Sequence, residues 1–473
     1  MVTLGAGPLS VDEVVAVARH RERVAVDPGV AAAMAPALAV VERAVAEGRT
    51  VYGVTTGFGA LAHTRVAPEE AAAVQQALVQ SHSSGMGALV EAEVVRAMQL
   101  LRARTLASGS SGVRPEIVSA IVDMLNAGVV PAVPEIGSLG ASGDLAPLAH
   151  AALVLTGGGW VVGPDGRPEA GGPALAAAGL APVTLRAKEG LALLNGTEGM
   201  LAHLCLAAAD LRVALSTADI TCAMSVEALL GTDAAYAERV QALRPHPGQL
   251  DAASNLRRLL AGSPIVASHR DSGHAVQDAY SLRCAPQVHG AARDTLAHLR
   301  RVVEVELASV TDNPLVFPED GAVLSGGNFH GQPLAHVADF AAIALAGLGA
   351  IVERRIDRLM DPARSQGLPP FLAVQAGVNS GFMLAHYTAA ALVNRLRGHA
   401  APSSIDSIST SGGQEDHVSM GWNACRCLRL AVADVFRVLA VELVCGAEAL
   451  ELRRDGRSGV AGAGGVAGAG APV

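Results

Sequence analysis

The chain has a single lysine, Lys188, so arginine supplies nearly all of its positive charge. A Schiff base with pyridoxal phosphate (PLP) would therefore have to use Lys188, which argues against PLP chemistry. Basic residues nowhere cluster among aromatic side chains, and the formal net charge is −9. A nucleic-acid backbone finds no complementary charge on such a chain, so we expect no nucleic-acid partner.

Cysteines and aromatic residues are also scarce. The six cysteines lack the paired spacing of a zinc site or a disulfide framework, so we expect reduced thiols and no bound metal. Aromatic residues make up 3% of the chain, although 51% of it is hydrophobic. Small apolar side chains therefore dominate the predicted core, and helices can pack closely.

No uninterrupted apolar run is long enough to cross a membrane. The best run, from Phe340 to Val352, is shorter than the roughly 20 residues that a bilayer requires, so we predict a buried helix there. The N-terminal residues MVTLGAGPLSVDEV reach an acidic amphipathic helix before any apolar segment typical of a secretory signal. We therefore expect a cytoplasmic protein without a membrane partner.

Helical patterns dominate the chain and lengthen after residue 195. Ser10 and Glu13 form a capping box, and Pro115 with Gly128 brackets a helix over 115–126. We predict a mainly α fold whose central part is a bundle of long helices. Further helices are predicted over 89–106, 145–155, 296–307 and 425–452, and short strands over 160–162 and 315–317. The predicted domains are an N-terminal domain over 1–194, a central long-helix domain over 195–454 and a flexible Gly/Ala tail over 455–473.

Residues 137–150, GSLGASGDLAPLAH, gather unusually small side chains around Ser142. Asp144 occupies the fifth position of GASGD, so the segment misses the G-x-S-x-G turn of serine hydrolases. One interpretation is a tight turn before the helix at 145–155. A second is chemical, because Gly143 has little steric barrier to bringing its amide nitrogen onto the Ala141 carbonyl.

This segment resembles the signature of the aromatic amino acid ammonia-lyases. VYGVTTGFGAL, LLNGTEGM, VQDAYSLRCAPQVHG and LSGGNFHGQP also resemble segments of that family, and the resemblance spans about Val11 to Leu452. It implies that Ala141, Ser142 and Gly143 cyclise by losing two waters to form a methylidene-imidazolone (MIO), an electrophile made from the backbone. It also implies a fumarase/aspartase-like architecture and a homotetramer whose active sites draw on more than one subunit.

The resemblance also implies roles for individual residues. Tyr52 matches the catalytic base on a mobile loop, and Asn195 matches the asparagine beside the MIO. Arg283 matches the arginine that binds the substrate carboxylate, a natural partner for a planar acid. Around these, the resemblance places Tyr280 and Gln277 beside the arginine and Phe329 in the wall of the ring pocket.

Two positions match the histidine-specific branch of the family, His82 in SHSSG and Glu415 in TSGGQEDHVSM. An imidazole ring has two nitrogens to satisfy, which a carboxylate and a histidine can do, whereas a phenyl ring would leave both groups without partners. Such unpaired polar groups discriminate strongly between substrates. The resemblance therefore implies an amino-acid substrate and the non-oxidative deamination of L-histidine to trans-urocanate and ammonia.

Three alternatives stay open from the sequence alone. A 2,3-aminomutase acting on histidine or another aromatic amino acid would share the MIO and return ammonia to the β-carbon. A phenylalanine or tyrosine ammonia-lyase would use a different ring. A non-catalytic helical scaffold would keep the fold without cyclising Ala141 to Gly143.

Overall fold

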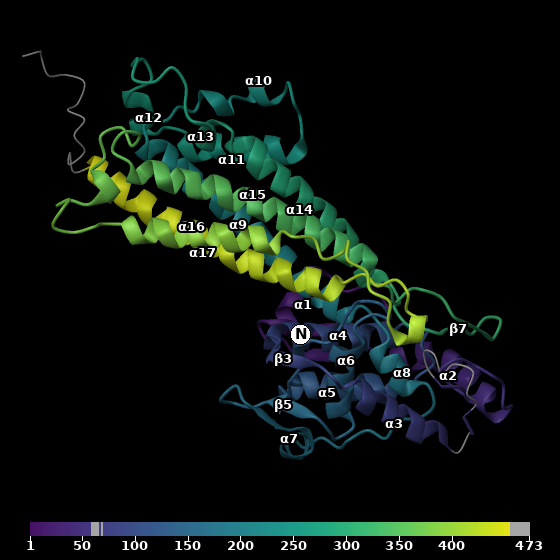
Figure 1. Cartoon of the computed structure of the whole chain (residues 1–473). Coiled ribbons are helices and arrows are strands. Elements are labelled where there is room, and N and C mark those ends of the chain that lie inside the picture. The colour runs from purple at the N-terminus through teal and green to yellow at the C-terminus, as the bar shows by residue number, and fades with distance from the viewer. Residues whose placement is uncertain (58–65, 68–69, 455–473) are drawn as a thin grey trace, which may run out of the picture. The chain divides into compact units, whose positions relative to one another are not determined.

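The computed structural model describes residues 1–57, 66–67 and 70–454, which form two compact units (Figure 1). The first unit comprises Met1–Ala209, His298–Asp339 and Pro402–Arg429. The second comprises Asp210–Ala297, Phe340–Ala401 and the described residues from Leu430 onward. The predicted domain boundary between residues 194 and 195 stays a prediction, and the predicted tail, 455–473, lies outside the described residues.

The described residues of the first unit form short helices and four small two-stranded sheets. Its helices are α1 (Val11–Ala18), α2 (Val30–Ala46), α3 (Ala71–His82), α4 (Ala92–Ala107), α5 (Pro115–Ala127), α6 (Leu145–Leu155), α7 (Gly171–Ala177) and α8 (Glu189–Leu194). Its sheets pair β1 (Val2–Leu4) with β2 (Val24–Val26) in parallel, and β3 (Met86–Leu89) with β4 (Pro134–Ile136), β5 (Trp160–Val162) with β6 (Pro168–Ala170), and β7 (Leu315–Phe317) with β8 (Ala322–Leu324) in antiparallel fashion.

Helices dominate the second unit, where long helices run alongside one another (Figure 1). Four helices have residues in both units: α9 (Glu198–Ala228), α14 (Ala285–Ala308), α15 (Gln332–Met360) and α17 (Gly421–Arg454). The others of the second unit are α10 (Glu238–Gln241), α11 (Pro247–Leu260), α12 (Pro264–Ser268), α13 (Tyr280–Arg283), α16 (Met383–His399) and the 3-10 turns η3 (Ala234–Tyr236) and η4 (Pro370–Leu372), while η5 (Ser411–Gly413) lies in the first unit. The prediction of a mainly α protein with long helices is confirmed.

Local sequence signals explain several helix boundaries. Ser10 Oγ accepts a hydrogen bond from the Glu13 N–H while the Glu13 carboxylate accepts one from the Ser10 N–H, which confirms the capping box of α1. Helix α5 ends where Gly128 adopts a left-handed conformation with φ of 73°. The predicted start of α4 at residue 89 is wrong by three residues, because Leu89 pairs in β3 and α4 begins only at Ala92.

Two apolar segments, Glu189–Ala228 and Gln332–Met360, are long and apolar enough by composition to cross a membrane, and more than half of each hydropathy window is buried. The apolar run over 340–352, on which the sequence prediction rested, is only part of the longer helix α15. That helix is buried on one face, but Phe340 and Ile343 are 47% and 48% exposed. The expectation of a buried helix is therefore right for one side of α15 only.

The single lysine lies in a fully buried ionic cluster of the first unit. Lys188 Nζ donates to the Asp312 carboxylate at 2.7 Å, and both side chains are inaccessible to solvent. Beside them, Arg102 pairs with Glu198 at 2.7 Å and lies 3.9 Å from Asp312. Burial lowers the pKa of Lys188, and the Asp312 charge opposes this shift. The Lys188 amine thus connects the loop before α8 to the loop at residue 312 through its contact with Asp312.

We expect Lys188→Met to destabilise the fold, because it leaves the buried Asp312 without its closest cation. Removing one partner of a buried ion pair typically costs about 3 kcal/mol or more. The midpoint of thermal unfolding measures the effect. Arg167→Met is the control, since Arg167 and its partner Asp165 are 85% and 60% exposed and such a pair contributes about 0–1 kcal/mol. Equal midpoints for the two variants would contradict this account.

Candidate active site

A cavity of about 510 Å³ opens in the first unit where five stretches of the chain meet. Six residues singled out from the sequence line it: Tyr52, Ala141, Ser142, Asn195, Phe329 and Glu415. The remaining lining residues are Asn313, Ser325, Gly326, His330, Gln414, Asp416 and His417. The cavity is therefore polar at several points and contains the Ala-Ser segment of the motif.

The Ala-Ser-Gly segment is a tight, buried turn in which a larger third residue would not fit. Gly143 has φ of +72°, and a Cβ at this position would overlap the Gly196 carbonyl. The Asp144 N–H donates to that same carbonyl at 2.7 Å, which fixes the turn against the residue after Asn195. The small side chains thus allow a close approach of two backbone segments.

Asp144 directly follows this turn, holds it in place and has no exposed surface. Its carboxylate accepts hydrogen bonds from Ser138 Oγ at 2.9 Å and from the Met200 N–H at 2.8 Å. Burial raises the pKa of Asp144 from 3.8 to about 7, while the two hydrogen bonds act in the opposite direction. Asp144 thereby connects the turn to the first residues of α9.

This shift predicts a pH-dependent stability. The folded chain keeps the Asp144 proton between pH 3.8 and about 7, where the unfolded chain has released it. Its stabilising contribution is therefore complete below pH 3.8, falls as pH rises, and is lost above about 7. We expect the thermal midpoint of Asp144→Asn to change less than that of the wild type between about pH 5 and about pH 8. Parallel pH curves for the two proteins would contradict the assignment.

Three helices begin next to residues that line the cavity. Helix α6 starts two residues after Gly143, α9 starts three residues after Asn195, and α15 starts three residues after Phe329. Helix N-termini carry partial positive charge, and the first turn of α9 already uses its Met200 N–H to bind the Asp144 carboxylate. The site is therefore suited to stabilise negative charge that develops near Ala141 and Ser142.

Asn195 ends α8 and offers an unused hydrogen-bond acceptor to the cavity. Asn195 is 5% exposed, and its buried Oδ1 atom has no hydrogen-bond partner among the described residues. A buried polar atom in this condition is costly unless something else binds to it. Tyr52 reaches the same cavity from the loop before residues 58–65, which lie outside the described residues.

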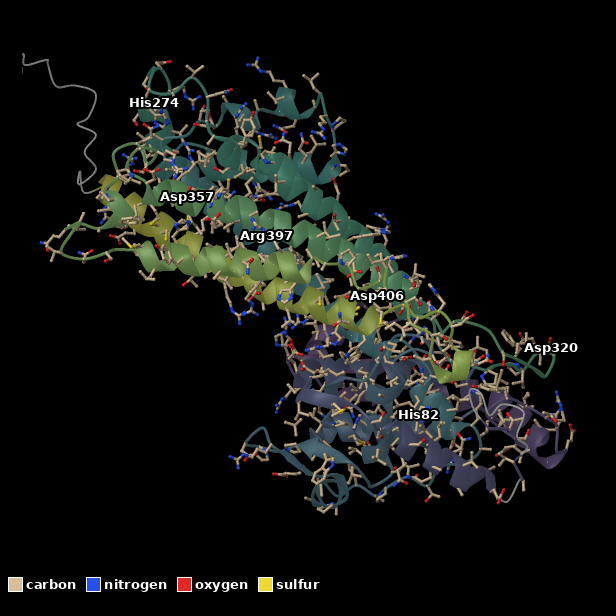
Figure 2. All side chains as sticks on the ribbon, in the orientation of Figure 1. His82, His274, Asp320, Asp357, Arg397 and Asp406 are labelled. Carbon is tan, nitrogen blue, oxygen red and sulfur yellow. The ribbon has the colours of Figure 1, made fainter. Side chains whose placement is uncertain are left out.

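Glu415 connects the motif with the predicted ring-binding residues. Ser142 Oγ donates to Glu415 Oε1 at 3.0 Å, and Thr410 Oγ1 donates to Oε2 at 3.3 Å. His82 is the last residue of α3 and is labelled in Figure 2. Burial lowers the pKa of His82, whereas the Leu78 backbone and the Glu415 charge raise it. His82 does not line the cavity itself, but it lies within the electrostatic reach of Glu415.

Arg283, predicted to bind the substrate carboxylate, belongs to the second unit, as do Tyr280 and Gln277, which were predicted to lie beside it. The Arg283 guanidinium stacks over the Tyr280 ring, with its carbon 4.5 Å from the ring centroid. Tyr280 is 69% exposed, and the buried Arg283 Nε has no hydrogen-bond partner within the part of the chain that the structure describes. Gln277 is exposed, and none of the three is among the residues that line the cavity of the first unit.

The sequence did not single out seven of the lining residues. Three of them stand directly beside predicted ones, since His330 follows Phe329 and Gln414 and Asp416 flank Glu415, and His417 is one residue further along. The rings of His330 and His417 stack at 5.7 Å with an interplanar angle of 8°. Their closeness in sequence to Phe329 and Glu415 could have identified these residues. Asn313, Ser325 and Gly326 gave no comparable signal. Among the described residues, no three His, Cys, Asp or Glu side chains are grouped to hold a metal ion.

Known proteins resemble this chain over almost its full length. A sequence model described as aromatic amino acid lyase matches residues 9–467. The histidine ammonia-lyase of Streptomyces griseus is 56% identical over 452 residues, which cover 96% of this chain and 88% of that protein. The crystal structure of histidine ammonia-lyase from Trypanosoma cruzi has a TM-score of 0.88 and 40% identity, covering 96% and 85% of the two chains. A tyrosine aminomutase from Streptomyces globisporus has a TM-score of 0.89 and 39% identity, covering 97% and 89%.

Proposed function

Because the chain belongs to the aromatic amino acid lyase family, we propose that it is a histidine ammonia-lyase that converts L-histidine to trans-urocanate and ammonia. The observation that carries the choice of substrate is the Glu415 carboxylate in the wall of the cavity, within electrostatic reach of His82. A carboxylate in the cavity wall with an imidazole near it complements the two ring nitrogens of histidine.

The residues around the motif fit an MIO made from Ala141, Ser142 and Gly143. Gly143 tolerates no side chain, and the buried Asn195 Oδ1 still needs a donor. Once formed, the MIO would supply an electrophile that makes the substrate amine a better leaving group. Loss of the Ser142 hydroxyl on its formation would remove the donor that now occupies Glu415 Oε1, and an imidazole N–H can then take that place.

The other lining residues take complementary roles in the proposal. Tyr52 accepts a proton from the β-carbon of the substrate as general base. Asn195 Oδ1 accepts a hydrogen bond from the substrate amine, and Phe329 packs against the ring. These groups act by holding the amine, ring and β-hydrogen in one reactive geometry, which can supply several kcal/mol of the barrier reduction.

We further propose a cytoplasmic homotetramer in which Gln277, Tyr280 and Arg283 bind the substrate carboxylate in the site of a neighbouring subunit. The unpartnered Arg283 Nε and the exposed Tyr280 support this, since an arginine fork suits a planar carboxylate. Exposed apolar side chains on the helices of the second unit also support assembly, among them Phe340 and Ile343 on α15 and Leu384 and Tyr387 on α16. A fully active monomer on a sizing column would contradict the shared site.

Incubation with L-histidine and ultraviolet detection tests the proposal. A rise in urocanate absorbance that proceeds to completion, with one ammonia per urocanate, is the expected result. Accumulation of a β-amino acid would instead favour the 2,3-aminomutase, which the similarity to a tyrosine aminomutase keeps as the second candidate. Turnover of phenylalanine or tyrosine but not histidine would overturn the substrate assignment.

A further inference from the structure

Gln75 lies on α3 at the junction of three chain segments that carry proposed active-site residues. Its side chain is 1% exposed and uses both ends of its amide. Its Nε2 donates to the Gly53 carbonyl at 3.2 Å, and its Oε1 accepts from the Leu191 N–H at 2.9 Å. Gly53 directly follows Tyr52, Leu191 lies in α8 four residues before Asn195, and α3 itself ends at His82.

The contact with Leu191 satisfies one backbone donor at the buried N-terminal end of α8. Helix α8 has only six residues, and Lys188, at its N-cap, makes no side-chain hydrogen bond to the first turn. Leu191 is the third residue of α8, so its N–H is one of the first-turn donors that a helix cannot satisfy internally. Gln75 supplies that acceptor from a distant part of the chain and thereby fixes the short helix that ends at Asn195.

The contact is close enough to restrict movement. A Cβ added to Gly190 would lie 2.7 Å from the Gln75 carbonyl oxygen and 3.0 Å from its side-chain oxygen. The backbones of α3 and α8 therefore meet at van der Waals distance, and a residue larger than glycine at position 190 would not fit between them. On the other side of the same amide, the Gly53 carbonyl holds the loop that presents Tyr52.

We propose that Gln75 is a positioning residue that sets the distance between Tyr52 and Asn195 in the reactive complex. This inference rests on the proposed function, in which Tyr52 removes the β-proton while Asn195 holds the amine. An amide is suited to the place because one end must donate and the other must accept. A displacement of about 1 Å in a reacting group can cost about 100-fold in rate, so a residue without substrate contact can control turnover.

Two substitutions separate the positioning role from a packing role. Gln75→Met keeps the approximate volume and removes both hydrogen bonds, and we expect kcat to fall about 10- to 100-fold with KM within about threefold. Gln75→Glu keeps the acceptor for Leu191, but its carboxylate faces the Gly53 carbonyl. Its protonated form has the hydrogen-bonding pattern of glutamine, and burial raises the pKa of such a carboxyl above its usual value of about 4.3.

The expected signature is a pH-dependent rescue. The ratio of kcat for Gln75→Glu to kcat for the wild type should rise as pH falls, whereas the ratio for Gln75→Met should stay constant. Gln76→Met is the matched control, because Gln76 is the next residue on α3 and its Nε2 donates to Thr156 Oγ1 at 3.2 Å instead. We expect wild-type kcat from it. Intact mass should show the same two-water deficit in all four proteins, so that loss of the electrophile does not account for the change.

The proposal is overturned if Gln75→Met retains wild-type kcat, or if both Gln75 variants are reduced by the same factor at every pH. If Gln75→Met does not fold, Gln75→Glu alone provides the test. The proposal is then overturned if the ratio of its kcat to the wild-type kcat does not change with pH. A wild type that releases no urocanate refutes the proposed function and not this inference. The same ratios are then measured with the amino acid that the wild type does consume.

Discussion

The Glu415→Gln variant is expected to lose about 100-fold or more in kcat/KM for L-histidine. In the proposed complex the carboxylate accepts a charge-assisted hydrogen bond from the imidazole, and a glutamine provides a weaker acceptor and an N–H group facing the ring. The existing contacts of Glu415, from Ser142 and Thr410, place it at the cavity wall before any substrate is bound. Initial rates of urocanate formation over a range of histidine concentrations measure the loss.

Two comparisons make this result specific. Asp406→Asn makes the same change of charge at an exposed position of the segment that leads to Glu415, and it should leave kcat/KM within about twofold, as surface substitutions usually do. Asp406 is labelled in Figure 2. Any residual turnover of phenylalanine should fall less than that of histidine, because its ring offers no N–H group. If kcat/KM for L-histidine were unchanged in Glu415→Gln, the proposed basis of specificity would be refuted.

The Ser142→Ala variant is expected to lose activity by a factor on the order of 10⁴ or more, as happens when a covalent catalytic group is removed. Without the hydroxyl, the second water cannot leave and the electrophile cannot form. The backbone should be unaffected, since the hydrogen bond that the Ser142 side chain makes to the described residues is its contact with Glu415 Oε1. Intact mass gives a direct readout, because the variant should lack the complete two-water deficit of the wild type.

Nearby substitutions separate the chemistry from the fold. Ser138→Ala removes a neighbouring hydroxyl that hydrogen-bonds Asp144, and it should keep the mass deficit. Gly143→Ala should lose both the deficit and stability, because its Cβ would overlap the Gly196 carbonyl at a residue with φ of +72°. A Ser142→Ala protein with wild-type turnover would rule out an electrophile built from these three residues.

Local patterns predicted much of the helical fold. The capping box at Ser10 and the glycine after α5 encode their helix ends within a few residues, so short-range chemistry was enough. Helix α6 and strand β5 have the predicted bounds for the same reason. The predicted helix over residues 425–452 lies inside the longer α17, whose first turn begins at Gly421. Boundaries that depend on pairing with a distant strand, as at Leu89, were missed.

The candidate site was predictable where its chemistry lies in contiguous motifs. Ala141 to Gly143 and Glu415 stood out because the segments that contain them resemble motifs of the family. Gln75 did not, because an isolated glutamine in a helix is unremarkable until two backbone partners from other segments surround it. The roles proposed for Arg283 and Tyr280 depend on an assembly that one chain's sequence does not specify geometrically, and they remain predictions.

The buried lysine has a practical consequence for measuring unfolding. A lysine-specific protease has one possible cleavage site in the entire sequence, after Lys188, and that side chain is completely enclosed in the fold. Cleavage therefore requires the surrounding loop and its Asp312 partner to open. A brief protease pulse would convert only opened molecules into two fragments, residues 1–188 and 189–473, so a gel would read the open population at any temperature or denaturant concentration.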